Sequence, residues 1–199
     1  LNHLVPLARG DFDLRYAVYP SFYFYVTWVW TRLALPAAAL VGLVPSVPLR
    51  ETLANHPERV LLAGRLLSAT AATLTVPLLI ALARTTIGRS AALVAGALLA
   101  TNVLHVRDAH AAKPDALLTL GVTVALAAMA ALVQAPSRRR AAAVGVAIGL
   151  TTGIKYPGLL LLAPGWVAAV FAPPRAGWRR WPLNDPGVVA AIAGVTFVA

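Results

Sequence analysis

Long apolar runs separated by short basic segments are the feature of this sequence that most constrains its fold. Of the 199 residues, 59% are hydrophobic and only 12% are charged, whereas soluble domains are about half apolar and about a quarter charged. The runs are roughly 17 to 27 residues long, which is enough for a helix to cross a bilayer. Because a chain in hydrocarbon must satisfy its own backbone hydrogen bonds, the sequence predicts an all-α, polytopic transmembrane bundle.

Breaks in the apolar pattern divide the chain into an N-terminal segment and a series of spans. Residues 1–55 are expected to form an outer loop with interfacial helices, since the tyrosines and tryptophans at 21–30 favour the headgroup level. A full span over 21–44 is the alternative. Residues 56–199 are expected to hold the transmembrane helices, at about 56–83, 90–106, 114–133, 141–153, a resumed run to 171, and a run from 187. We treat 1–199 as one membrane-embedded domain that is truncated at both ends, because it begins without methionine and ends inside an apolar run.

The net charge of +10 is distributed as in a membrane protein. The loops after alternate spans are rich in arginine, at positions Arg84, Arg89, Arg138, Arg139, Arg140, Arg175, Arg179 and Arg180. The positive-inside rule places these loops in the cytoplasm, so the 107–113 loop, the turn at Lys155 and the N-terminal segment lie together on the outer side. We therefore expect an integral protein of the bacterial plasma membrane whose site faces outside. No aromatic and basic interleaving suggests a nucleic-acid partner.

The stretch 102–115 gathers ionisable residues between two apolar runs. Such groups are costly at a membrane edge and usually line a cavity or a site. The carboxylates of Asp108 and Asp115 could orient or deprotonate a molecule that accepts a transferred group. Either the helix that starts near Pro114 uses Asp115 to stabilise its positive end, or the carboxylate belongs to a site. Asp108 has the alternative of a local ion pair with Arg107 or Lys113.

Lys155 interrupts an apolar stretch between Gly153 and Gly158, which predicts a broken helix. Broken helices at membrane depth are tolerated where they line a cavity, and a lysine there can act as a point charge for a phosphate. The alternative is a lysine that snorkels to the interface. Arg65 either pairs with Glu58, seven residues earlier on the same face, or contacts an anionic head group.

Five short motifs occur in order along nearly the whole chain, at Gly10–Asp13, Tyr19–Tyr25, Arg65–Ala69, Arg107–Thr119 and Gly149–Gly158. This ordered set resembles the family 39 and related glycosyltransferases of the GT-C fold. These include the dolichyl-phosphate-mannose-protein mannosyltransferases, the aminoarabinose transferases of lipid A and the bacterial RgtA/B/C/D-like group.

The resemblance implies an enzyme that moves a hexose or pentose from a polyprenyl-phosphate-linked donor to an extracytoplasmic lipid, glycan or protein acceptor. The main acidic base of such enzymes lies in their first outer loop, which is expected upstream of Leu1. Asp108 and Asp115 match a second acidic motif, and Arg65 and Lys155 match donor-phosphate contacts. Further residues that could line the site are Asp11, Tyr19, His110, Lys113 and Tyr156. The one cofactor that the sequence suggests is a divalent metal ion. Its candidate ligands are His105, Asp108 and His110, although their spacing matches no specific metal-binding motif.

Two other classes of protein remain as alternatives. A secondary transporter also uses broken helices and internal charges, but it predicts an internal repeat, and the Lys155–Gly158 motif has no counterpart in the other half. A non-catalytic membrane subunit predicts that Asp108, Asp115 and Lys155 tolerate substitution.

Overall fold

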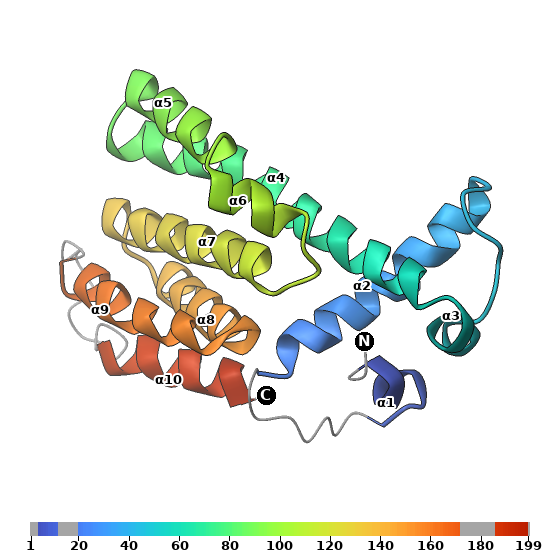
Figure 1. Ribbon diagram of the computed structural model, residues 1–199. Coiled ribbons are helices and arrows are strands. Elements are labelled where there is room, and N and C mark those ends of the chain that lie inside the picture. The colour runs from blue at the N-terminus through green and yellow to red at the C-terminus, as the bar shows by residue number, and fades with distance from the viewer. Residues whose placement is uncertain (1–3, 12–19, 172–185, 199) are drawn as a thin grey trace.

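The computed structural model describes residues 4–11, 20–171 and 186–198, and every regular element in these ranges is helical. The elements in chain order are α1 (Leu4–Ala8), α2 (Phe22–Leu40), α3 (Leu49–Asn55), α4 (Pro57–Thr86), α5 (Arg89–Ala100), α6 (Val103–Ala109), α7 (Asp115–Gln134), α8 (Arg138–Ile154), the 3₁₀ helix η1 (Tyr156–Leu161), α9 (Leu162–Phe171) and α10 (Pro186–Val198) (Figure 1). The predicted all-α fold is confirmed.

Helix α4 is the element against which much of the N-terminal half packs. Pro57 lies in its first turn, where the missing N–H costs nothing, as the sequence predicted. One face of α4 buries small residues such as Gly64, Ser68 and Ala71, and α2, α5, α6 and α7 all contact this helix. Small side chains let neighbouring backbones approach closely. The Trp30 indole N–H of α2, for example, donates to the Ala63 carbonyl at 2.8 Å.

Helices α7 to α10 form a second group below α4 and α5 in Figure 1. Its core is apolar and includes Met129, Leu132, Val144 and Ile148. Glycines again set the close contacts, because a Cβ on Gly145 would lie 2.8 Å from Ile192 of α10. Dispersion contacts of this kind hold helices together where lipid removes most of the hydrophobic driving force.

Two helices within the described ranges, Pro57–Thr86 and Asp115–Gln134, are long and apolar enough to cross a membrane, and the bent pair α5 and α6 adds a third if it is one span. Large apolar side chains remain exposed along these helices, for example Leu62 at 54% and Leu98 at 66%. An exposed apolar surface of this extent suits contact with lipid rather than with water. The chain is an integral membrane protein.

The span predicted at about 90–106 is broken in the structure. Helix α5 ends at Ala100, and α6 leaves it at an angle of 58°. The cause is Asn102, which is extended (φ −66°, ψ 122°) and whose side-chain oxygen accepts from the N–H groups of Leu104 at 3.0 Å and His105 at 3.1 Å. An asparagine in this role starts a new helix rather than continuing the old one.

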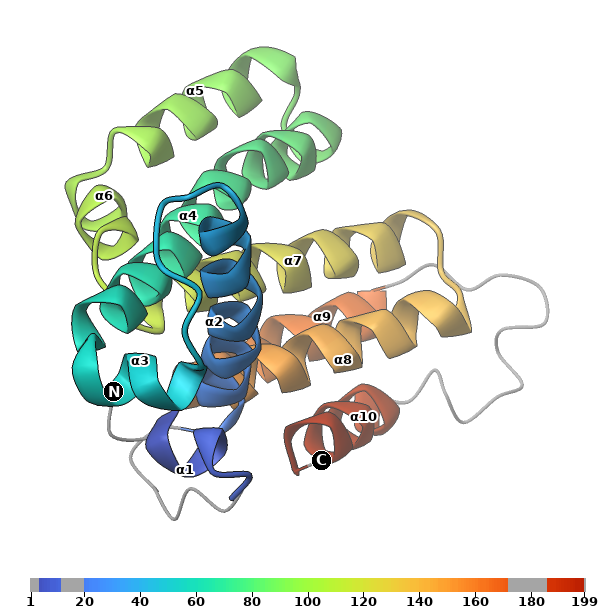
Figure 2. The ribbon, with the colours of Figure 1, turned by 90° about the vertical axis from the view of Figure 1, so that its right-hand side faces the viewer.

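The N-terminal segment packs on the beginning of α4. Leu4 and Leu7 of α1 join Val60 of α4 in a small cluster with residues of α2. Helix α2 is a single 19-residue helix with Pro36 inside it. It is not among the described helices that are both long and apolar enough to cross a membrane. Figure 2 shows α2 between α4 and the end of α8, both of which it contacts. The division into an outer loop at 1–55 and a membrane part at 56–199 stays a prediction.

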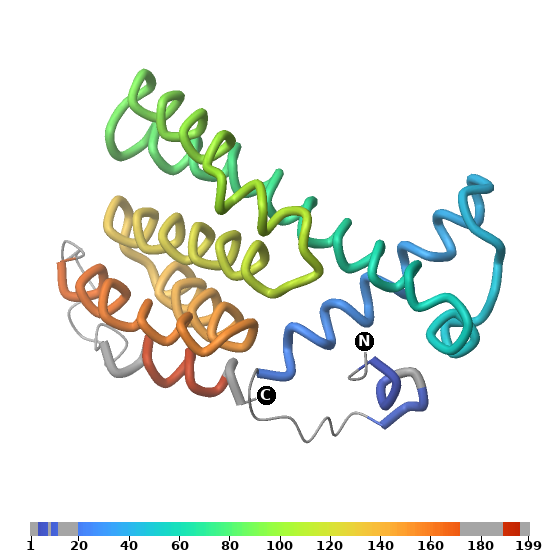
Figure 3. Tube along the Cα trace, viewed as in Figure 1, coloured from blue at the N-terminus to red at the C-terminus, as the bar shows by residue number. Residues whose placement is uncertain are grey.

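The chain reversals separate two sets of charges. The connections after α4 and α7 lie at one end of the helices (Figure 3). The helix ends that they join carry Arg84, Arg89 and Arg138–Arg140. The 110–114 loop and the break at Lys155 lie at the other end, beside the start of α2 (Figures 1 and 3). The predicted grouping of Lys155 with the 107–113 loop is confirmed.

Candidate functional site

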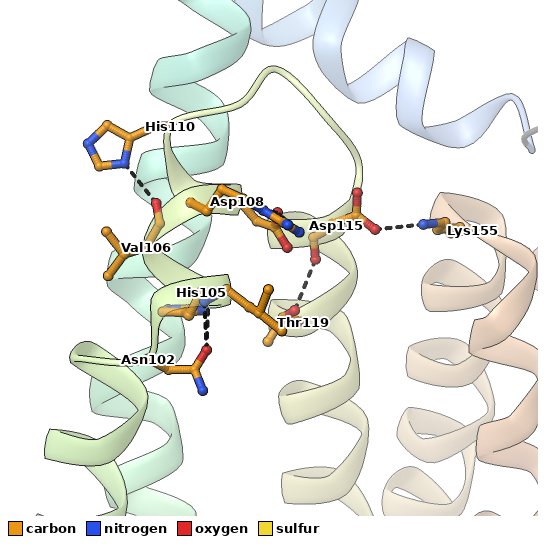
Figure 4. A network of polar contacts seen from close by, with 10 residues as sticks. Asn102, His105, Val106, Asp108, His110, Asp115, Thr119 and Lys155 are labelled. Atoms are coloured by element: carbon orange, nitrogen blue, oxygen red, sulfur yellow. Dashed lines mark hydrogen bonds and ion pairs between the residues drawn. The ribbon is translucent and has the colours of Figure 1, made fainter.

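An ion pair joins two of the motifs identified in the sequence. The Lys155 Nζ atom donates to Asp115 Oδ1 at 2.6 Å, although the two residues are 40 positions apart (Figure 4). The side chains are 26% and 33% exposed, respectively. A charge-assisted hydrogen bond this short, between two side chains that are mostly withdrawn from solvent, is stronger than a surface ion pair.

Local structure explains how Asp115 reaches this position. Pro114 is buried and precedes the first residue of α7, so Asp115 occupies the first helical turn. Its carboxylate therefore also faces the positive end of the helix dipole. The two roles considered for Asp115, helix stabilisation and membership of a polar site, occur together.

Lys155 lies at the predicted helix break. Helix α8 ends at Ile154, Lys155 is extended (φ −159°, ψ 135°), and η1 follows. A Cβ on Gly158 would lie 2.6 Å from the carbonyl carbon of Thr151, so the turn can fold back on α8 only with glycine at this position. The break thus directs the lysine side chain toward α7 instead of along the α8 axis.

Helix α2 closes another side of this region. A Cβ on Gly153 would lie 3.1 Å from the Cβ of Phe22, so the first turn of α2 packs directly on the end of α8. The next residue, Tyr23, is buried at 8% exposure. Burial raises the pKa of the Tyr23 phenol, the negative charge of Asp115 raises it further, and a hydrogen bond with Thr27 lowers it. The sequence favoured a membrane-belt role for Tyr23 over a place near a sugar site, and it gave no sign of the electrostatic interaction with Asp115.

Asp108 forms the local ion pair that the sequence offered as an alternative. Arg107 donates to Asp108 Oδ1 from Nη2 at 3.0 Å and from Nε at 3.1 Å. The Asp108 side chain is 24% exposed and that of Arg107 is 68% exposed. Asp108 therefore has a solvent-exposed partner, whereas the partner of Asp115 is mostly buried.

His105 and His110 each contact a backbone carbonyl group. His105 Nε2 lies 3.2 Å from the Ala72 oxygen of α4. His110 Nδ1 lies 2.7 Å from the Val106 oxygen, as Figure 4 shows. Among the described residues, no three His, Cys, Asp or Glu side chains gather in a way that could hold a metal ion. The three candidate ligands His105, Asp108 and His110 thus do not form a metal site by themselves.

The 110–114 loop rests on α4 next to Arg65. The Ser68 hydroxyl donates to the Lys113 carbonyl at 3.3 Å, and a Cβ on Gly64 would lie 3.0 Å from the Cβ of Ala112. The Arg65 side chain is exposed. Its predicted alternative partner Glu58 instead contacts His56 Nδ1 at 3.3 Å, and no ion pair in the described part of the chain joins Glu58 to Arg65.

Three of the remaining predicted lining residues, Asp11, Lys113 and Tyr156, are exposed. Lys113 and Tyr156 are exposed and flank Asp115 and Lys155 in the chain. Asp11 is exposed after the turn at Gly10, whose φ is 83°. Tyr19 lies outside the described residues.

The sequence matches the family model described as dolichyl-phosphate-mannose-protein mannosyltransferase over residues 57–199. The chain belongs to this family. The match starts at the first residue of α4 and includes Asp108, Asp115 and Lys155. No curated protein and no solved structure matches the chain. The family supports a membrane glycosyltransferase-like protein in general terms and disfavours the transporter alternative.

Proposed function

We propose that this protein transfers a sugar from a polyprenyl-phosphate-linked donor to an acceptor on the extracytoplasmic side of the membrane. The observation that carries the proposal is the Asp115–Lys155 pair. It places a cation and a carboxylate at one end of an apolar helical bundle, opposite the arginine-rich connections. A reaction between a membrane-bound phosphate ester and a polar acceptor needs both groups at such an end.

Lys155 has the chemistry to bind the leaving phosphate. When the bond between the anomeric carbon and the phosphate oxygen breaks, negative charge develops on the lipid phosphate, and a preorganised cation stabilises that charge. An ammonium group has three N–H donors, so contact with Asp115 Oδ1 is compatible with a second bond to a phosphate oxygen. Asp115 would hold the ammonium in place while the donor enters and leaves. Arg65, exposed beside the 110–114 loop, is the second proposed phosphate contact.

The carboxylates have a role on the acceptor side. As the acceptor hydroxyl oxygen attacks the anomeric carbon, its proton must pass to a base within hydrogen-bond reach. Asp108, whose present partner is the solvent-exposed Arg107, can exchange that partner for an acceptor hydroxyl at little cost. By resemblance, the main base belongs to the first outer loop of the family, and Asp108 would then orient the acceptor.

The test follows consumption of a radiolabelled polyprenyl-phosphate sugar by the full-length protein in membranes. We expect wild type and the control Arg139→Gln to consume the donor, whereas Lys155→Ala and Asp108→Asn lose most of the activity while remaining folded. Equal activity in all four proteins would contradict the assignment of these residues. Inactive wild type across a panel of hexosyl and pentosyl donors would contradict the proposed function. A parallel reaction with EDTA tells whether a divalent metal ion is needed.

A further inference from the structure

A small cavity lies away from the Asp115–Lys155 pair, at the junction of α2, α3 and the start of α4. Its volume is about 50 Å³, and its lining includes Pro36, Val44, Pro45, Ser46, Thr52 and Arg59. It shares no residue with the site proposed above. Roughly 10–15 Å³ of such space holds one water molecule, so the cavity has room for about three to five waters or a group of similar size.

Arg59 gives the lining of this cavity a positive charge. Its guanidinium Nη1 atom is buried and has no hydrogen-bond partner in the part of the chain that the structure describes. No acidic residue lines the cavity, and Arg59 is the charged residue among the lining residues. Arg59 as a whole is half-buried, but a buried guanidinium N–H group without an acceptor is costly, and a water molecule can accept its hydrogen bond but cannot neutralise the charge.

Several other lining residues offer no free hydrogen-bond donor that could take the place of Arg59. Pro36 and Pro45 have no backbone N–H to offer. The Thr52 hydroxyl already donates to the Pro48 carbonyl at 3.1 Å. Ser46 supplies a second hydroxyl group to the lining. An arginine with one hydroxyl, in a space that fits a tetrahedral group, matches an anion with several acceptor oxygens.

The surroundings indicate where such an anion comes from. Four residues before Pro36 on the same helix, Arg32 lies over the Trp28 ring at 4.9 Å. Both residues lie in the middle of α2, and a tryptophan beside an arginine is typical of the headgroup level of a membrane, where lipid phosphates lie. We propose that this cavity binds a phosphate-type oxyanion through Arg59 and Ser46, supplied by a lipid head group or by free phosphate.

The test uses the purified full-length protein in nanodiscs and measures its melting temperature. One arm titrates inorganic phosphate into neutral phosphatidylcholine discs, and the other replaces part of the phosphatidylcholine with phosphatidylglycerol. The variants are Arg59→Gln, which removes the cation, and Ala39→Leu, which fills the cavity from α2 and keeps Arg59. Arg89→Gln, exposed at the opposite end, controls for the general attraction of a basic protein to anions.

We expect phosphatidylglycerol to raise the melting temperature of wild type and Arg89→Gln by several degrees, and both cavity variants to lose most of that rise. A rise with inorganic phosphate as well identifies free phosphate as a sufficient ligand, whereas a rise with phosphatidylglycerol alone identifies a lipid head group. The proposal is overturned if neither anion stabilises wild type, or if the cavity variants respond as wild type does. If Arg59→Gln does not fold, Ala39→Leu decides between these results.

Discussion

The Asp115–Lys155 ion pair predicts a measurable coupling between two helices. The side chains are 33% and 26% exposed, so the pair lies between a surface pair and a buried one. Exposed pairs contribute about 0.2–1 kcal/mol, and breaking a buried pair costs about 3–5 kcal/mol. With a 2.6 Å contact, we expect an interaction energy of about 1–3 kcal/mol.

A double-mutant cycle of Asp115→Asn and Lys155→Met isolates this energy. Asp115→Asn also weakens the interaction with the α7 dipole, by about 0.3–1 kcal/mol, but this effect is the same with and without Lys155 and cancels in the cycle. The assay is reversible unfolding of the full-length protein in mixed micelles by increasing SDS. Sites that do not interact give additive effects within about 0.3–0.5 kcal/mol. Additivity in this range would refute the pairing.

Three further outcomes test the packing and the orientation of the bundle. Gly121→Ala places a Cβ 2.7 Å from Thr151 Oγ1, so it should lower the unfolding free energy by about 1–3 kcal/mol. Adding Thr151→Ala to this variant should restore most of the lost stability. A double variant that is no more stable than Gly121→Ala would exclude this contact as the cause. Arg140→Gln should lower the unfolding free energy by about 1–3 kcal/mol, because Arg140 Nη1 donates to the Ala131 and Ala135 carbonyls at 2.8 and 2.7 Å at the end of α7. The control Arg139→Gln, at an exposed position, should change it by no more than about 0.5 kcal/mol. Equal losses in the two variants would show that the capping bonds do not matter. Residues 1–199 contain no cysteine, so Lys113→Cys and Arg139→Cys each add one thiol to this region of the full-length protein. An impermeant maleimide added to intact cells should increase labelling for Lys113→Cys only, and increased labelling for Arg139→Cys instead would reverse the proposed orientation.

Much of the fold follows from local signals in the sequence. Apolar runs of spanning length predict helices because the bilayer leaves the backbone no other partner. Pro57 and Lys155 mark a start and a break through local backbone chemistry, and the structure has both where the sequence places them. The break at Asn102 had an equally local signal, an asparagine followed by a helical stretch, but the surrounding apolar residues suggested one continuous span.

The site required information that no local pattern contains. Asp115 and Lys155 were each predicted as site residues on one face of the membrane, but their direct contact depends on how α7 packs on α8. Tyr23 reaches this region because Gly153 lets α2 pack on the end of α8, and a tyrosine in an aromatic run carries no sign of that. Arg140 was interpreted as a marker of topology, but it also caps α7.

The central claim, that Lys155 binds the phosphate of the donor, is tested most directly by the affinity of the full-length protein for a polyprenyl phosphate without sugar. Loss of one charge-assisted hydrogen bond costs about 1.5–3 kcal/mol, which corresponds to roughly 10- to 150-fold in affinity. We expect Lys155→Met to bind the lipid phosphate at least about tenfold more weakly than wild type, with Arg139→Gln unchanged. An affinity of folded Lys155→Met equal to that of wild type would contradict the account.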